Sequence, residues 1–112
     1  MKRIEIIIPH RRLDDVSEIL KDANTGGMSH YRIEGRGKVK AEPVEAARGT
    51  ARFTPEFIPR TKVEVIVKDE QVEPLIDRLT ERLGDELGGK LFISDVLVTV
   101  DLSTKKRGES AI

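Results

Sequence analysis

The chain has no cysteine among its 112 residues, and this absence excludes several chemistries together. Without cysteine there can be no disulfide, no thiolate metal site and no cysteine nucleophile. Basic and acidic residues number 20 each, so the formal net charge is zero at pH 7. Bulk electrostatics therefore gives no argument for binding to nucleic acid or to a membrane surface.

Long apolar runs are absent as well. No segment approaches the length of a membrane span, and the opening MKRIEIIIPH is too short and too polar for a signal peptide. A cytoplasmic protein is therefore the expectation. At this length we expect one domain, spanning residues 1–112.

The apolar residues that are present alternate with the periods of strands and helices. Period-two alternation predicts four strands, and helical spacing predicts two amphipathic helices. The expected strands cover residues 2–9, 29–35, 60–68 and 90–102, and the expected helices cover 12–23 and 72–83. NTGG (24–27) is typical of a helix exit, with glycine supplying a positive φ.

The order strand–helix–strand therefore occurs twice in one small domain. This order predicts an α+β, ferredoxin-like fold with both helices on one face of a four-stranded antiparallel sheet. The other face then carries apolar residues that a monomer would expose, so we expect an oligomer that covers it.

A long segment separates the two units. Residues 36–59 show no sustained period, and a connection of this length usually has a function or is disordered. From Arg36 to Lys62 there are seven basic and three acidic residues, so this part of a neutral chain is locally positive. A second basic segment, KKRG (105–108), lies in the C-terminal tail, residues 103–112. It is either a solvated end or a cover for a ligand phosphate.

Two clusters combine glycine with a base. Gly88-Gly89-Lys90 could present backbone N–H groups and an ammonium to an anion, or it could be an ordinary exit from the second helix. Gly35-Arg36-Gly37-Lys38 is either a similar anion site or a loop entrance. The expected fold can bring both clusters to one edge of the sheet.

Catalysis and metal binding find little support in the residues. His10 and His30 are far apart in sequence, and neither has a carboxylate at ligand spacing. We expect His10 to be solvated and His30 to face outward. There is no Ser-His-Asp arrangement, and the paired acids look like helix-end charges. We therefore assign no catalytic residue and no metal ligand.

Several segments together resemble the PII signalling proteins, which sense nitrogen or carbon status. The segments are the opening MKRIEIIIPHRRLDDV, then GGMS, EGRGKVK, ARG, FIPRTKVEVIV, GGKLFISDV and the final AI. The resemblance covers essentially the whole chain. It implies a ferredoxin-like homotrimer with adenine nucleotides in clefts between subunits and a long loop that contacts partners.

The resemblance also implies a set of nucleotide-binding residues. Gly35, Gly37 and Lys38 would lie near the phosphates, and Gly88, Gly89 and Lys90 would form the phosphate-binding turn. Ser29, Glu64 and Val65 would surround the adenine.

The chain departs from the nitrogen-sensing members, which read GFGRQKG where this chain reads GRGKVKA. Val39 replaces a glutamine that helps to hold magnesium and 2-oxoglutarate, and Arg60 replaces the lysine that binds the 2-oxoglutarate carboxylate. The only tyrosine, Tyr31, lies in a strand, so the loop has none for uridylylation.

The tail departs too. Asp101 and Ser103 replace two arginines that contact the triphosphate, and an aspartate there would repel a γ-phosphate. Lys105, Lys106 or Arg107 could supply replacement charge.

These departures are similar to those of PII-like members linked to inorganic-carbon transport. The resemblance then implies a non-enzymatic sensor that binds ADP or AMP in preference to ATP and regulates carbon uptake through a membrane transporter. Bicarbonate would need charge-assisted donors, for which the candidates are Lys38, Lys40 and Arg60. No covalent cofactor and no nucleic acid is implied.

Two alternatives stay open. One is a nitrogen-regulatory PII protein that binds ATP with 2-oxoglutarate and controls an ammonium transporter or an enzyme. The other is an enzyme or metal-binding protein on the same scaffold, as copper-tolerance relatives suggest, and the lack of cysteine argues against it.

Overall fold

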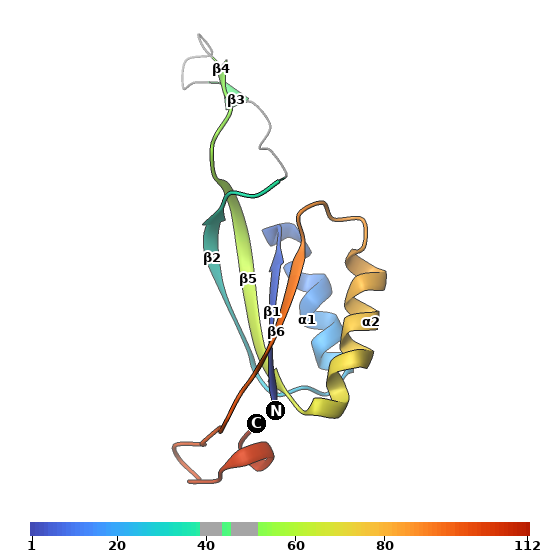
Figure 1. The fold of residues 1–112 in the computed structure, drawn as a ribbon, viewed down its shortest axis with the longest axis vertical. Helices are drawn as coiled ribbons and strands as arrows, with labels where there is room; N and C mark the ends of the chain where they lie inside the picture. The colour runs from blue at the N-terminus through green and yellow to red at the C-terminus, as the bar shows by residue number, and fades with distance from the viewer. Residues whose placement is uncertain (39–43, 46–51) are drawn as a thin grey trace.

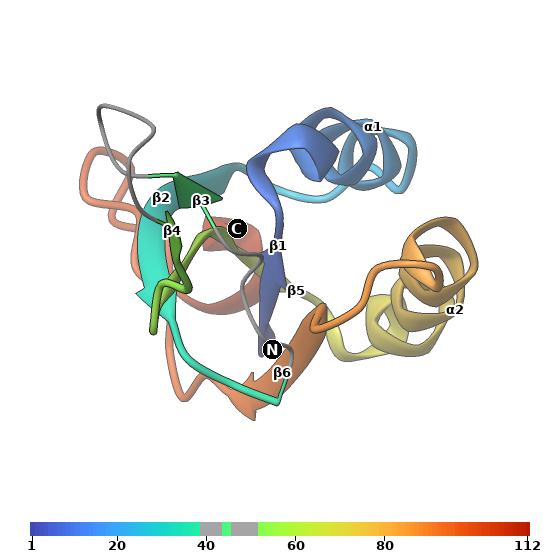
Figure 2. The ribbon, with the colours of Figure 1, turned by 90° about the horizontal axis from the view of Figure 1, so that it is seen from above.

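The computed structural model describes residues 1–38, 44–45 and 52–112. A four-stranded antiparallel sheet carries two helices side by side on one of its faces (Figures 1 and 2). Its strands are β1 (Lys2–Ile8), β2 (Met28–Gly35), β5 (Ile58–Val67) and β6 (Lys90–Asp95), and the helices are α1 (Leu13–Asp22) and α2 (Val72–Leu83). The order across the sheet is β2-β5-β1-β6. This is the ferredoxin-like α+β arrangement, and the prediction of fold class is confirmed.

The core forms because β1 and β5 alternate in phase. Ile4 is paired with Val65 and Ile6 with Val63, so their side chains point to the same face, toward the helices. Each such side chain contributes about 1.5–3 kcal/mol when fully buried. The core members are Ile4, Ile6, Ile8, Val63, Val65 and Val67 from the sheet, and Val16, Ile19, Leu20, Leu75 and Leu79 from the helices.

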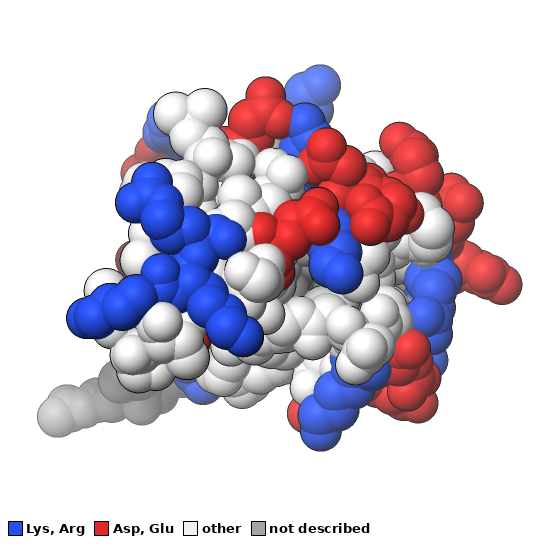
Figure 3. Space-filling model, turned by 90° about the horizontal axis from the view of Figure 1, so that it is seen from below, with Lys and Arg blue, Asp and Glu red and all other residues white. Residues whose placement is uncertain are grey.

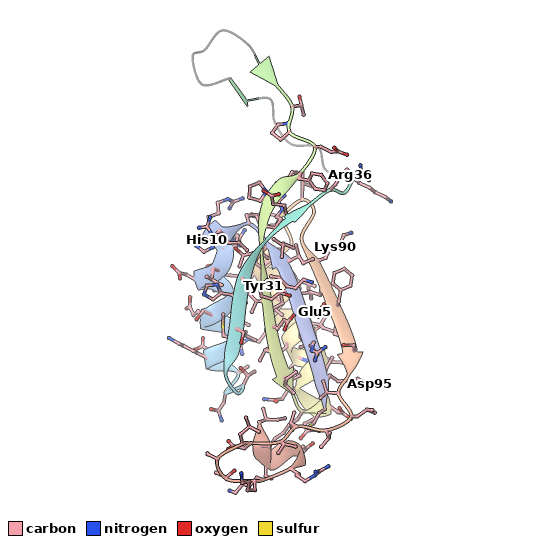
Figure 4. All side chains as sticks on the ribbon, turned by 90° about the vertical axis from the view of Figure 1, so that its left-hand side faces the viewer. Glu5, His10, Tyr31, Arg36, Lys90 and Asp95 are labelled. Atoms are coloured by element: carbon pink, nitrogen blue, oxygen red, sulfur yellow. The ribbon has the colours of Figure 1, made fainter. Side chains whose placement is uncertain are left out.

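The face of the sheet away from the helices mixes apolar and charged side chains. Tyr31 donates a hydrogen bond of 2.9 Å from its hydroxyl to Glu64, and the Lys62 ammonium lies 3.9 Å from the Glu5 carboxylate. Figure 4 shows Glu5 and Tyr31 on this face. Phe92 is half exposed beside them. Apolar area is therefore uncovered as expected, but it is interrupted by this ion pair and this hydrogen bond, and the oligomer that would cover it stays a prediction.

The fourth strand is shorter than the predicted 90–102, because it ends at Asp95. Its only neighbour, β1, begins opposite Asp95, at Lys2, so no strand remains beside the alternating residues that follow. The last link is the Val96 amide, which donates to the Met1 carbonyl. Beyond it the chain turns back on itself through a bridge between Val100 and Arg107. It ends in a 3₁₀ turn, Gly108–Ala111.

The exit from α1 also differs in detail from the prediction. The positive φ falls on Asn24, at 55°, and not on a glycine. Asparagine tolerates this conformation better than other side chains with a Cβ. Gly26 has another reason to be small: a Cβ there would lie 2.8 Å from Cγ2 of Ile112. This glycine therefore lets the end of the tail pack against the turn after α1.

The segment predicted to lack structure, 36–59, contains a short ladder. β3 (Val44–Glu45) pairs with β4 (Arg52–Phe53), and β5 begins at Ile58, before the predicted start at residue 60. The segments that lead into and out of the loop, residues 36–38 and 54–57, are called its two legs. They continue directly from β2 and β5 (Figure 1).

A pair of adjacent glycines tests how the tail is anchored. In Gly26→Ala the new methyl group must push Ile112 away, because 2.8 Å is shorter than any ordinary Cβ contact. We expect faster hydrogen exchange in residues 108–112 with little change in melting temperature. Gly27→Ala is the matched control, since a Cβ there meets nothing within 4 Å. Equal exchange in the two variants would contradict the anchoring role.

Candidate functional site

A groove of about 430 Å³ lies at the end of the sheet from which the long loop leaves. It forms because four strand ends meet there: Gly35 of β2 is paired with Ile58 of β5, and Lys90 of β6 is paired with Ile7 of β1. The lining residues are Ile7, Ile33, Gly35, Arg36, Gly37, Lys38, Ile58, Arg60, Gly88 and Lys90. Both glycine-plus-base clusters of the sequence therefore contribute to one groove.

The lining has one sign of charge. Arg36, Lys38, Arg60 and Lys90 line the groove, and no aspartate or glutamate is among its lining residues in the part of the chain described. Isoleucines and glycines form the remainder of the wall, so the cations act beside a surface of low polarity, where electrostatic attraction is stronger than in open water. Figure 4 shows Arg36 and Lys90 at this end of the sheet. The arrangement is suited to an anion that carries an apolar part.

Glycine occupies its positions in the groove for different reasons. Gly88 has φ of 81°, so the turn itself requires glycine. Gly35 and Gly37 have no positive φ, and a Cβ on either would meet no atom of the described residues within 4 Å. Their small size is not needed for packing against that part of the chain, and it leaves room for a ligand to approach the backbone.

The turn before β6 divides its glycines between two sides. Gly88 lines the groove, whereas Gly89 donates its amide to the Glu86 carbonyl at 3.4 Å. Gly89 instead lines a second cavity, of about 330 Å³, between α2 and β6. Of the predicted Gly88-Gly89-Lys90 cluster, the structure therefore places Gly88 and Lys90, but not Gly89, in the groove.

Arg36 is a functional candidate that the sequence reasoning did not single out by itself. Its guanidinium forms an ion pair with Glu56, on the other leg of the loop, and lies 5.9 Å from the centre of the Phe57 ring. These partners are about twenty residues away, so local spacing carried no signal for them. Arg36 thus contacts both the groove and the opposite leg.

The residues expected around an adenine lie elsewhere on the sheet. Ser29 is paired with Glu64 across β2 and β5, toward the start of β2. Glu64 accepts the hydrogen bond from Tyr31. The Val65 side chain is buried in the core, so only its backbone could contact a ligand.

The basic residues of the tail lie at the opposite end of the sheet from the groove (Figure 1). Lys105, Lys106 and Arg107 are exposed there, and Figure 3 shows basic side chains gathered on one side of this end and acidic ones on another. Within one chain the structure therefore does not bring Lys105 or Arg107 to the groove. They could meet a ligand in that groove only from another subunit.

Asp101 organises the turn of the tail. One of its carboxylate oxygens accepts hydrogen bonds from the amides of Ser103 and Thr104 and from the Ser103 hydroxyl, at 2.9–3.0 Å. The bond from the Thr104 amide and those from Ser103 lower the pKa of Asp101 from its ordinary value of 3.8. The carboxylate is therefore ionised at neutral pH and is already engaged within the chain.

The two histidines are closer than their sequence separation indicates. Their ring centres are 6.5 Å apart, and Nδ1 of His10 lies 3.0 Å from the hydroxyl of the buried Thr61. Both histidines are exposed, although His30 is paired with the buried Val63 and therefore stands on the helix side of the sheet. Among the described residues no group of three or more His, Cys, Asp or Glu could hold a metal ion. Two other residues of interest, Val39 and Lys40, lie outside the described residues.

A comparison with family models matches residues 1–106 to the family described as nitrogen regulatory protein P-II. The chain belongs to the PII family. Proteins named nitrogen regulatory protein P-II from Rhodobacter capsulatus and Pasteurella multocida are 34% and 38% identical to it, and each match covers the whole of both chains. Nitrogen regulatory protein P-II 1 of Escherichia coli K12 is 33% identical over the same full coverage. The resemblance read from the sequence is confirmed.

Membership of the PII family assigns this chain to a class of regulatory signalling proteins. None of the helices that the structure describes is long and apolar enough to cross a membrane.

The Asp101 turn of this PII protein should respond to acid. Because its folded-state pKa is lowered, its contribution to the stability of the turn is complete above the ordinary pKa of 3.8 and is lost as the pH falls through the folded-state value. We expect the protection factor of the Thr104 amide, which is the intrinsic exchange rate at a given pH divided by the observed rate, to fall below that pH, as followed by NMR. In Asp101→Asn this protection factor should not change with acid in this range. An acid response that persists in the variant would show that another group controls the turn.

Proposed function

We propose that this PII protein is a non-enzymatic sensor that binds an adenine nucleotide in the groove. The observation that carries the proposal is the lining of the groove, where four cations and no described acidic residue surround an apolar wall. Phosphates would contact Arg36, Lys38 and Lys90 through charge-assisted hydrogen bonds. The base would contact the apolar wall or residues farther along the open face, where Ser29 and Glu64 lie.

The groove is open to solvent on the side of the sheet that the helices leave bare. We propose that a homotrimer covers this face and completes each nucleotide site between two subunits. The position of the tail agrees with this, because Lys105 and Arg107 could approach a groove only from another copy (Figure 1).

A preference for ADP or AMP over ATP is also part of the proposal. The resemblance to nitrogen-sensing members implies arginines at the places of Asp101 and Ser103. The Asp101 carboxylate stays ionised because its hydrogen bonds lower its pKa. A fixed negative charge at this place disfavours a terminal phosphate.

Bicarbonate is the proposed second ligand. Arg60 and Lys38 line the same groove, so a small anion could be held beside the nucleotide phosphates by two charge-assisted donors. Lys40 remains the third candidate. The output would then be the regulation of inorganic-carbon uptake, in the cytoplasm, by contact of the loop with a membrane transporter.

Coupling between the groove and the loop can occur through Arg36. A phosphate in the groove would compete with Glu56 for its guanidinium, so occupancy of the groove changes the contacts between the two legs of the loop. A ligand shifts such an equilibrium only by its different affinity for the two states.

Nitrogen regulation is the second candidate, and the names of the relatives favour it. In that case ATP and 2-oxoglutarate would bind together, and the partner would be an ammonium transporter or an enzyme. Arg60 could serve the 2-oxoglutarate carboxylate as a lysine does, whereas Val39 cannot ligate magnesium.

Calorimetric titration separates the two candidates. Wild-type protein is titrated with AMP, ADP and ATP, first with bicarbonate and then with 2-oxoglutarate. We expect ADP or AMP to bind more tightly than ATP and to be strengthened by bicarbonate. Synergy of ATP with 2-oxoglutarate would instead establish nitrogen control. Lys90→Ala should weaken nucleotide binding about tenfold or more, the loss of one charge-assisted contact, and Lys21→Ala, on the far helix, should not.

The Arg36–Glu56 pair gives a test of the coupling. In Glu56→Gln the Arg36 guanidinium can contact a phosphate without breaking an ion pair. We therefore expect ADP to bind about two- to fivefold more tightly, a change that corresponds to the energy of one exposed ion pair. Exchange in residues 54–58 should rise in the ligand-free protein. Glu34→Gln removes the same charge close by on β2 and is the control. Weaker binding in Glu56→Gln would mean that the pair prepares Arg36 for the ligand, contrary to the proposal.

A further inference from the structure

Two acidic residues stand close to the turn that carries Gly88 and Lys90. Asp85 and Glu86 precede Gly88 by three and two positions. In a groove that attracts anions, two nearby negative charges would oppose the ligand if their fields were not compensated. The affinity of the groove for an anion therefore depends on how these two carboxylates are paired and where they point.

Both carboxylates are paired with Arg12, at the start of α1. One guanidinium nitrogen, Nη1, donates to Asp85 at 3.1 Å and to Glu86 at 2.9 Å. The other two nitrogens hold the helices: Nε donates to Asp15 at 2.7 Å, and Nη2 donates to the Arg82 carbonyl at 2.8 Å. The Arg12 side chain is only 12% exposed and that of Glu86 is 9% exposed, whereas Asp85 is 79% exposed. Arg12 thus joins α1, the end of α2 and the turn.

The same contacts decide where the acidic side chains point. Glu86 is 9% exposed and is also paired with Arg11 at 2.7 Å. It lines the cavity between α2 and β6 and is not among the residues that line the groove. Its carbonyl accepts the Gly89 amide, so the position of Glu86 sets the start of the turn.

The Asp85 carboxylate is not neutralised by protonation. The hydrogen bond from Arg12 is the main cause that lowers the pKa of Asp85. The carboxylate is charged at neutral pH, and its field is compensated by the guanidinium.

We propose that Arg12 is a positioning residue for the anion groove: it holds Asp85 and Glu86 on the helix side of the turn and, together with Arg11, compensates their charge, so that the groove presents cations alone. The inference rests on the proposed anion-binding function of the groove. It assigns Arg12 no contact with the ligand. A lysine could not replace it, because one ammonium does not reach four acceptors in a planar fork.

The experiment compares four proteins by calorimetry with ADP and, separately, with inorganic pyrophosphate. They are the wild type, Arg12→Gln, Arg82→Gln, and Arg12→Gln combined with Asp85→Asn and Glu86→Gln. Arg82→Gln is the matched control, because Arg82 pairs with Asp15 and Glu18 in the same network but not with the acids of the turn. Melting temperatures are measured in parallel.

We expect Arg12→Gln to weaken both ligands about five- to tenfold, because Asp85 loses its cationic partner and Glu86 keeps Arg11 alone. The combined variant should regain most of this affinity, although its melting temperature stays low, because the lost helix contacts are not restored. Arg82→Gln should lower the melting temperature and leave the affinity within twofold of the wild type. A purely structural Arg12 would give no such recovery.

The outcomes separate this inference from the proposed function. Binding of pyrophosphate but not ADP, with the expected order of variants, would support the role of Arg12 and overturn nucleotide binding. Wild-type affinity for ADP in Arg12→Gln would overturn the positioning role alone, and binding of neither ligand by the wild type would overturn both.

If Arg12→Gln does not fold, a double variant that keeps Arg12, Asp85→Asn with Glu86→Gln, still tests the positioning role. Affinity within twofold of the wild type supports compensation by Arg12, and an increase beyond fivefold shows that the acids were never compensated.

Discussion

The pairing register of β1 with its two neighbours is the constraint on which the rest of the molecule depends. Isoleucines at alternate positions of β1 face valines of β5 on the helix side, so burial of this set selects one register. A slip by one residue would turn every side chain of the strand to the other face. The same register places Lys90 opposite Ile7 and Arg60 opposite Ile33 on the open face. The apolar core thus determines where the cations of the groove stand, although it contacts none of them.

Charge is separated across the end of the sheet. On the open side, the described lining of the groove is basic; on the helix side, the acids of the turn are gathered around Arg12. A chain with zero net charge can therefore hold a local field of one sign. The net charge of the whole chain gave no argument for an anionic ligand. The separation of basic from acidic residues explains why the composition could not predict one.

The fold could be predicted from the sequence because alternation and helical spacing are local signals. α2 has the predicted bounds, and the faces of β1, β2 and β5 follow the alternation. The prediction failed where a local pattern lacked a partner: Val98 and Val100 alternate like strand residues, but β1 has no residues left to pair with them. Convergence of the two glycine clusters was foreseeable from the topology. The partners of Arg12 beyond Asp15 were not, because they lie some seventy residues along the chain and no spacing reveals them.

Gly35 and Gly37 combine ordinary backbone angles with empty space where a side chain would be. In the arrangement described here, alanine would fit at both positions without a clash. What glycine adds is the set of other backbone conformations that this leg can enter, a freedom that costs conformational entropy whenever the leg is held in one of them. Any partner or ligand that holds Gly35 and Gly37 in one conformation must offset that cost. The entropy of these two residues is therefore a penalty that binding at the groove has to exceed.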